Sequence, residues 1–252
     1  MSASHPAPAS SRELAVPRFA QPDDVTCGPT CLLSVLRYYG DQTPFARLLE
    51  LTPTNPDGGT LAVFLGQVAR ALGYRARLYS YNYRVVDPSW RGLDSDDVRA
   101  RLLRRAEVSP KPKVQAACRA YAEFLAAGGE LAFEDLSPEL LVGALERGHP
   151  VLCGLSATYL YEWPRERPDD NAVDDVGGDP VGHFLVICGH AEGGAHFSVR
   201  DPFSHVPAPE RDGSYAVAGR RLLNAILLGI VSYDAVLLEV WPEAEDPPKE
   251  SA

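Results

Sequence analysis

The sequence is most informative near its N-terminus, where it reads Gln21-Pro22-Asp23-Asp24-Val25-Thr26-Cys27-Gly28-Pro29-Thr30-Cys31. Apolar residues then recur at helical spacing as far as Tyr39, and Gly40 follows, which predicts a helix over residues 28–39. Cys27 therefore stands where a loop becomes a helix. The partial positive charge and unpaired N–H groups of a helix N-terminus favour a thiolate, the nucleophilic form of cysteine. We interpret Cys27 as a candidate nucleophile.

The neighbours of Cys27 suit this chemistry. Gly28 permits close approach of the backbone to a bound substrate. Pro29 is tolerated in the first helical turn because its missing N–H would be unpaired there. Gln21 lies six positions before Cys27. Its side-chain amide and the Cys27 N–H would together form an oxyanion hole, which stabilises the charge that develops on a carbonyl oxygen.

A cysteine nucleophile needs a base and a group that orients the base, and both are usually distant in sequence. His183 opens an apolar run that predicts a strand over residues 182–189, and Asp201 ends the next predicted strand, 196–200. Two neighbouring antiparallel strands would place Asp201 beside His183, where a carboxylate fixes the imidazole tautomer. The candidate catalytic residues are Cys27, His183, Asp201 and Gln21, and the candidate substrate-binding residues are Gly28 and Gly182.

These residues resemble the bacteriocin-processing, double-glycine-leader cysteine peptidases, a branch of the papain-like fold. The matching positions are Gln21, Cys27-Gly28, Cys31-Leu32, Tyr38-Tyr39-Gly40, His183 and Asp201-Pro202. The matched segments cover roughly residues 22–75 and 138–241. The chain differs from the family pattern at Thr26, where members usually carry Asp, and in the 156 positions that separate Cys27 from His183. The resemblance implies a papain-like fold and a Cys-His-Asp triad.

The predicted elements describe an α+β protein. Helices in the first half are followed by several strands, which favours helices packed on a mostly antiparallel sheet. The predicted helices lie at 28–39, 45–51, 60–72, 94–105, 113–127, 136–147 and 220–228, and the predicted strands at 74–81, 151–155, 182–189, 196–200 and 235–241. We expect a disordered leader over residues 1–17, a papain-like peptidase domain over 18–242 with a helical insertion at about 82–135, and a disordered tail over 243–252.

Composition argues against several classes of protein. The 252 residues include 24 Lys and Arg against 34 Asp and Glu, a net charge of −10, whereas nucleic-acid binding depends on clustered basic residues. No window reaches the ~18 consecutive apolar residues of a membrane span. Residues 1–17 lack the basic and apolar regions of a secretory signal. We therefore expect a cytoplasmic protein that binds neither nucleic acid nor membrane.

The five cysteines are an odd number without a framework pattern, so reduced thiols are expected: four that pack in the core, and Cys27 as the reactive one. Cys27 and Cys31 could nominally bind zinc with His183 and Asp201. The spacing matches no structural zinc site, and no Cys-x-x-Cys pair is present. We expect neither a metal nor another cofactor.

The loop over residues 165–179 carries six acidic residues shortly before His183: Glu166, Asp169, Asp170, Asp174, Asp175 and Asp179. One interpretation is a solvated, mobile loop. The other is a lid over the cleft that favours basic or amine-bearing substrates. Calcium binding is disfavoured because the acids fit no EF-hand spacing.

The sequence thus predicts a cysteine peptidase or amide hydrolase that acts on a peptide or small amide substrate. Two alternatives stay open. A thioester formed at Cys27 can pass its acyl group to an amine, as in phytochelatin-synthase-like relatives of this fold, or the chain can be a non-catalytic peptide-binding module. An intact triad argues against the binding module, which has no need of all three groups. The substrate and the oligomeric state stay open.

Overall fold

A computed structural model of the chain describes residues 10–54, 59–206, 213–231 and 235–243. Within these residues an eight-stranded sheet runs in the order β3-β2-β8-β4-β5-β6-β7, and β1 pairs with β5. The β2–β3 pair is parallel and the other pairs are antiparallel. The strands are β1 (Arg12–Glu13), β2 (Tyr74–Ser80), β3 (Glu130–Ala132), β4 (Val151–Ser156), β5 (Gly182–Ala191), β6 (His196–Arg200), β7 (Ser214–Ala218) and β8 (Val236–Pro242).

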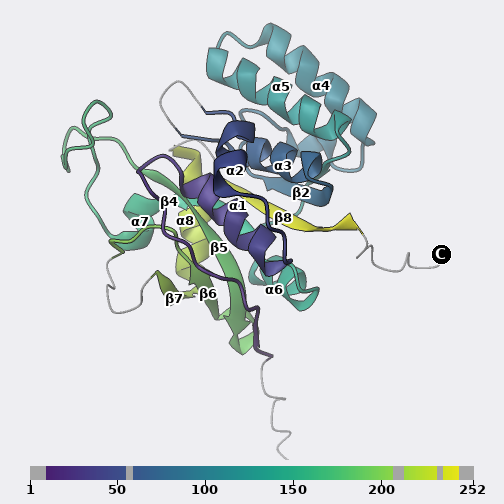
Figure 1. Ribbon diagram of the computed structural model, residues 1–252. Coiled ribbons are helices and arrows are strands. Elements are labelled where there is room, and N and C mark those ends of the chain that lie inside the picture. Colours follow the sequence, from purple (N-terminus) through teal and green to yellow (C-terminus); the bar gives the residue numbers. More distant parts are fainter. Residues whose placement is uncertain (1–9, 55–58, 207–212, 232–234, 244–252) are drawn as a thin grey trace, which may run out of the picture.

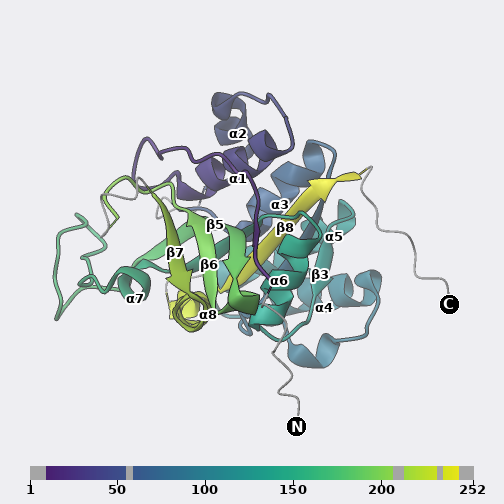
Figure 2. The same cartoon turned by 90° about the horizontal axis from the view of Figure 1, so that it is seen from below.

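Helices cover both faces of the sheet. Figure 2 shows α1 and α2 on one side of β5, β6 and β7, with α8 on the other. The helices are α1 (Cys27–Tyr38), α2 (Phe45–Leu51), α3 (Ala62–Ala71), α4 (Ser95–Val108), α5 (Pro112–Ala126), α6 (Pro138–Glu146), α7 (Ala157–Tyr161) and α8 (Gly219–Leu228). Short 3₁₀ turns occur at Pro88–Trp90, Glu192–Gly194 and Gly229–Val231. The predicted α+β arrangement, with the Cys-bearing helix on a mostly antiparallel sheet, is confirmed.

The helix α1 is held against β5 by its apolar face. Leu32, Val35 and Leu36 are fully buried, as their helical spacing predicts. Gly28 lies in the first turn, where a Cβ atom would come 2.6 Å from the Cγ2 atom of Thr60 and 3.5 Å from the ring of Phe184 on β5. The absence of a side chain at Gly28 therefore lets the N-terminus of α1 settle close to the start of β5.

The predicted helical insertion consists of α4 and α5, which Figure 1 shows packed side by side beyond α3 and β2. Asp94 caps α4 by accepting a hydrogen bond from the Asp97 N–H. The buried residues Val98, Leu102 and Ala106 recur along one face of α4, at the spacing of an amphipathic helix. The insertion also includes β3, an edge strand that the sequence does not predict.

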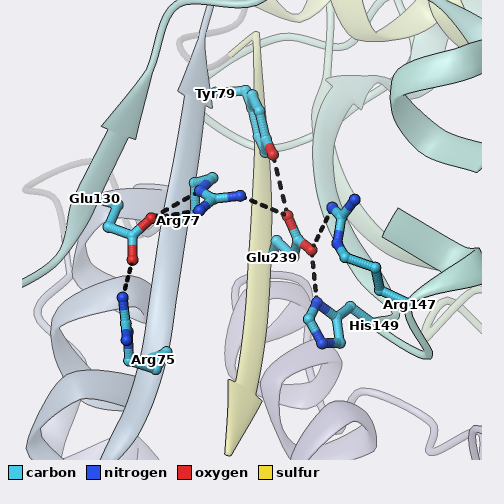
Figure 3. Close-up of polar contacts among 7 residues, drawn as sticks. All are labelled: Arg75, Arg77, Tyr79, Glu130, Arg147, His149 and Glu239. Carbon is cyan, nitrogen blue, oxygen red and sulfur yellow. Dashed lines mark hydrogen bonds and ion pairs between the residues drawn. The ribbon is translucent and has the colours of Figure 1, made fainter. Parts of the chain in front are cut away.

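A buried ionic network joins β8 to its neighbours (Figure 3). Glu239, in the middle of β8, is fully buried and accepts hydrogen bonds from Tyr79 (3.1 Å), Arg147 (2.8 Å) and His149 (2.6 Å). At the edge of the sheet, Glu130 of β3 bridges two arginines of β2. Burial disfavours the charged carboxylate of Glu239, but these hydrogen bonds and the Arg147 charge lower its pKa to about 2.

Several expectations need correction. The expected disordered leader does not extend to residue 17, because Arg12–Glu13 pair with β5 and both Leu14 and Val16 are buried. The sequence also does not predict the short elements β1, β3, α7 and β7. The expected disorder at residues 1–9 and 244–252 lies outside the described residues. Among the described residues, no helix is long and apolar enough to cross a membrane.

Candidate active site

His183 and Asp201 meet at the end of two neighbouring strands. His183 is the second residue of β5, and Asp201 follows the last residue of β6, which pairs with β5. The Nε2 atom of His183 lies 2.9 Å from Oδ1 of Asp201. The imidazole is 8% exposed and the carboxylate is fully buried. The structure therefore brings together two of the residues that the sequence singles out.

Cys27 reaches the same place from the other side of the imidazole. It is the first residue of α1, and its side chain lies close enough to His183 to affect the pKa of the imidazole. Because Nε2 of His183 contacts Asp201, Nδ1 is the ring nitrogen left for the thiol. The Cys27 N–H belongs to the first helical turn, where main-chain N–H groups have no partner inside the helix. Cys27 thus lies near His183, and His183 is in direct hydrogen-bond contact with Asp201.

Asp201 is held by four donors. Oδ1 accepts from the His183 ring (2.9 Å) and from the Phe203 N–H (3.0 Å). Oδ2 accepts from the hydroxyls of Tyr161 and Tyr215, at 2.6 Å each. Burial would raise the pKa of Asp201, but the charge of His183 and the hydrogen bonds from His183, Tyr161 and Tyr215 lower it below the usual 3.8. Asp201 is therefore a carboxylate at neutral pH.

The same contacts set the protonation of His183. Burial disfavours the imidazolium, but the charge and hydrogen bond of Asp201, together with the nearby Cys27, raise the pKa of His183 from 6.5 to about 10. The resting site at neutral pH therefore holds a protonated imidazole between a carboxylate and a thiol. A neighbouring imidazolium favours the thiolate form of a cysteine.

Gln21 lies beside the site and lines its cavity. Its main-chain N–H donates to the Pro202 carbonyl (2.9 Å), which ties the segment before α1 to the residue after Asp201. The side-chain Nε2 donates to the Asp23 carbonyl at 2.7 Å. An amide nitrogen carries two hydrogens, so one stays available to a ligand. Among the described residues, no hydrogen-bond partner reaches the buried Oε1 atom of Gln21.

A cavity of about 380 Å³ opens next to His183. One side is aromatic: the ring of Tyr161 lies 5.3 Å from that of Trp163 and 6.3 Å from that of Phe203, measured between centroids. Gly182 lines this cavity and is exposed, as expected of a substrate-binding residue. Gly28 does not line it, because it is buried against Thr60, Leu65 and Phe184. The structure therefore shows Gly28 packed in the interior of the protein.

The acidic loop contributes one carboxylate to the cavity. Glu166 lines it together with Asp24, which comes from the segment before α1. Asp170 is paired with Arg167, and Asp174 accepts hydrogen bonds from two main-chain N–H groups of its own loop. Burial and the negative charge of Asp24 raise the pKa of Glu166. The carboxylates of Asp170 and Asp174 are therefore used within the loop, and Glu166 faces the space beside His183.

The remaining cysteines are buried, as the sequence predicts. Cys31, Cys118, Cys153 and Cys188 are all free and buried, whereas Cys27 is partly exposed. Burial raises the pKa of each buried thiol, so these four stay protonated at neutral pH. Among the described residues, no three His, Cys, Asp or Glu side chains are placed to hold one metal ion.

The tyrosines that hold Asp201 are the functional residues that the sequence analysis misses. Tyr161 ends α7 and Tyr215 lies on β7, and neither element is predicted. A partial signal does exist for one of them, because Tyr215 and Val217 alternate with small residues after Gly213, a strand-like pattern. Tyr161 lies in a segment with no clear periodicity.

A comparison with known proteins finds a family match in the N-terminal part of the chain. Residues 16–88 match the model of the Peptidase C39 family, and this segment includes Gln21 and Cys27. No curated protein matches the chain. The match confirms the predicted resemblance over that segment. Together with the position of the Cys27 helix on the antiparallel sheet, it supports a cysteine peptidase of papain-like fold.

Three solved structures are similar to the chain. The peptidase domain of Streptococcus ComA, a bifunctional ABC transporter, is 15% identical, covers 90% of this chain and 99% of its own, and has a TM-score of 0.43. A double glycine motif protease from an AMS/PCAT transporter, in complex with the leader peptide, is 14% identical, covers 93% of this chain and 97% of its own, and has a TM-score of 0.43. A putative C39-like peptidase from Bacillus anthracis is 15% identical, covers 91% of this chain and 97% of its own, and has a TM-score of 0.46.

Proposed function

Because the N-terminal part of the chain matches the Peptidase C39 family, we propose that the protein is a cysteine peptidase or amide hydrolase that uses Cys27, His183 and Asp201 as its triad. The observation that carries this proposal is the position of His183, hydrogen-bonded to Asp201 at 2.9 Å and close to Cys27 at the start of α1. Five free cysteines favour a reducing compartment, so we assign the protein to the cytoplasm.

The chemistry follows from the protonation of the three groups. The Cys27 thiolate attacks the carbonyl carbon of the substrate amide and forms a tetrahedral intermediate. The His183 imidazolium then gives its Nδ1 proton to the departing amine, which leaves a thioester on Cys27. Neutral His183 next takes a proton from water, the hydroxide displaces the sulfur, and the acid product is released with the thiolate and imidazolium restored. Asp201 stays ionised and holds the imidazole throughout.

The developing oxyanion has two candidate donors. The Cys27 N–H lies at the start of α1, where no helical carbonyl accepts from it. The second hydrogen on Nε2 of Gln21 is available, because the first is used by the Asp23 carbonyl. Two such donors stabilise an oxyanion more than the neutral carbonyl that precedes it. Replacing one donor is expected to lower kcat by about 10²-fold.

The proposed substrate is a peptide or amide that carries a basic or amine group. Asp24 and Glu166 line the cavity beside His183, and within the described part of the chain neither carboxylate forms an ion pair. The aromatic rings of Trp163 and Phe203 form another part of the wall. A cation is stabilised both by carboxylates and by the faces of aromatic rings.

The direct test is hydrolysis of a mixed peptide library, followed by mass spectrometry of the products. Wild type and His196→Ala, a control that removes an exposed histidine, are expected to cleave the same peptides, whereas Cys27→Ala and His183→Ala are not. Products that carry an added amine in place of water would instead identify acyl transfer. Cleavage that survives in Cys27→Ala would refute the proposed nucleophile.

A second assay tests the preference for a cation. Peptides that differ only by lysine or norleucine at one position are compared in wild type, in Asp24→Asn/Glu166→Gln, and in Asp170→Asn. We expect the lysine preference to fall about tenfold in the double variant, the size of one favourable charge interaction. Asp170→Asn should keep it, since Asp170 is paired with Arg167 and lies outside the cavity. An unchanged preference in the double variant would exclude these carboxylates as its source.

A further inference from the structure

The carboxylate of Asp201 has more polar partners than its contact with His183 requires. Because Asp201 is fully buried, no water reaches the oxygen that points away from the imidazole. That oxygen, Oδ2, instead accepts two short hydrogen bonds, from Tyr161 and from Tyr215. A carboxylate has about four lone-pair sites, and with the two bonds at Oδ1 all of them are used.

The two hydroxyls lie where they restrict the rotation of the carboxylate. The terminal torsion of an aspartate is broad, so one contact with a histidine does not fix the plane of the carboxylate. Two donors on one oxygen and a main-chain donor on the other leave one favourable plane, with an oxygen directed to His183. Both phenols keep their protons, because burial and the Asp201 charge raise the pKa of Tyr161 and of Tyr215.

The tyrosines reach Asp201 from separate elements. Tyr215 projects from β7, which pairs with β6, and Tyr161 comes from the end of α7, on the cavity side. Arg18 adds a third contact from the N-terminal segment, by donating to the main-chain oxygen of Asp201 at 2.9 Å. The titratable and charged groups that face Asp201 are therefore His183 on β5, Tyr161 on α7, Tyr215 on β7, Arg18, Cys31 on α1 and Cys153 on β4.

We propose that Tyr161 and Tyr215 are positioning residues, which hold Asp201 in the one orientation that orients and charges His183. Neither hydroxyl touches the reacting atoms, so both act through the carboxylate. This inference rests on the proposed function, because it assigns the tyrosines to the same triad. A positioning role differs from the role of a tyrosine whose hydroxyl only stabilises the fold.

The chain offers a matched control for this distinction. Tyr79 is also a buried tyrosine that donates to a fully buried carboxylate, Glu239, at 3.1 Å. It lies on β2, on the other side of β8 and β4 from the strand that carries His183. Tyr79→Phe therefore removes the same kind of hydrogen bond without touching the site.

The test is an NMR titration of ¹⁵N-labelled histidine in wild type, Tyr161→Phe, Tyr215→Phe and Tyr79→Phe. We expect the pKa of His183 to fall by about one unit in each of the first two variants, because a carboxylate that has lost one of its donors is held less firmly against the imidazolium. In Tyr79→Phe, His183 should titrate as it does in wild type. The proposal fails for either tyrosine whose variant leaves His183 unchanged, and it fails for both if Tyr79→Phe produces the same shift.

Peptide hydrolysis gives an independent kinetic readout. Tyr215 does not line the cavity beside His183, so Tyr215→Phe should lower kcat about tenfold and leave KM within about twofold. A change in KM alone would overturn the positioning role of Tyr215. If wild type cleaves no peptide, the proposed function fails, whereas the titration of His183 needs no substrate and still decides the role of the tyrosines.

Discussion

His183 makes the stability of the protein depend on pH in the neutral to alkaline range. Its pKa is about 10 in the folded protein, above the 6.5 of an unperturbed histidine. The folded protein therefore binds the proton of His183 more tightly than the unfolded chain does. This contribution is complete below pH 6.5 and is lost as the pH rises toward 10.

We expect wild type to lose on the order of a few kcal/mol of unfolding free energy through this pH range, beyond what His183→Gln loses. Urea unfolding of both proteins at several pH values measures the difference. Groups away from His183 titrate alike in both chains and cancel, and Cys27→Ala in both backgrounds removes the thiol that is coupled to it. Parallel stability curves would show that the charge on His183 does not stabilise the fold.

Gly28 is a second residue whose role is open to direct measurement. A Cβ atom there would lie 2.6 Å from Cγ2 of Thr60, so Gly28→Ala should destabilise the protein by about 1–3 kcal/mol, the usual range for an overpacked core. Thr60→Ser removes the obstructing methyl group and keeps the hydroxyl that bonds to the Pro53 carbonyl. The double variant should recover most of the loss. Thermal unfolding that shows no recovery would exclude this contact as the cause.

At the scale of elements, the position of β8 depends on Glu239. This carboxylate is buried and joins β8 to Tyr79 of β2 and to Arg147 and His149 before β4. Glu239→Gln should therefore cost about 1–3 kcal/mol, because the amide nitrogen takes the place of a buried oxygen that accepts hydrogen bonds. Glu130→Gln is the matched control: its carboxylate is 29% exposed, so about 1 kcal/mol or less is expected. Chemical unfolding that ranks the two variants equally would contradict this account.

The elements also show what can be predicted from the sequence. Helix α2 and strand β6 coincide with the predicted ranges 45–51 and 196–200, because their patterns are local and their ends carry turn residues. Strand β3 has three residues, too few for any periodicity, and its pairing with β2 is set by the packing of α5 and the turn before it. Short elements that depend on a distant partner leave little trace in the sequence.

The residues of the candidate site also differ in whether a local sequence pattern predicts them. Cys27, His183 and Asp201 stand at the ends of a helix and two strands, so their local sequences identify them. Tyr161 and Tyr215 reach Asp201 from α7, which has no clear periodicity, and from β7, whose alternating pattern is only a partial signal. The sequence leaves open whether the acidic loop is a solvated loop or a lid over the cleft, and it does not show that an ion pair and a turn use Asp170 and Asp174.

At the scale of the whole molecule, the fold joins residues that are 156 positions apart in sequence. The first helix packs on β5, so the thiol of Cys27 meets the imidazole of His183. The insertion of α4 and α5 lengthens the interval between them and packs beyond α3, away from the site (Figure 1). A long insertion is therefore compatible with the proposed triad, because α4 and α5 supply none of its residues.

The most direct test of the triad is iodoacetamide labelling of Cys27 as a function of pH, resolved by site with mass spectrometry, in wild type and in His183→Ala. The four buried cysteines serve as internal controls. We predict that Cys27 reacts faster than the other four at pH values well below about 8.5, the pKa of a free thiol, and that His183→Ala abolishes this advantage. Slow labelling of Cys27, unchanged in His183→Ala, would contradict a Cys27–His183 pair and leave a peptide-binding module as the better account.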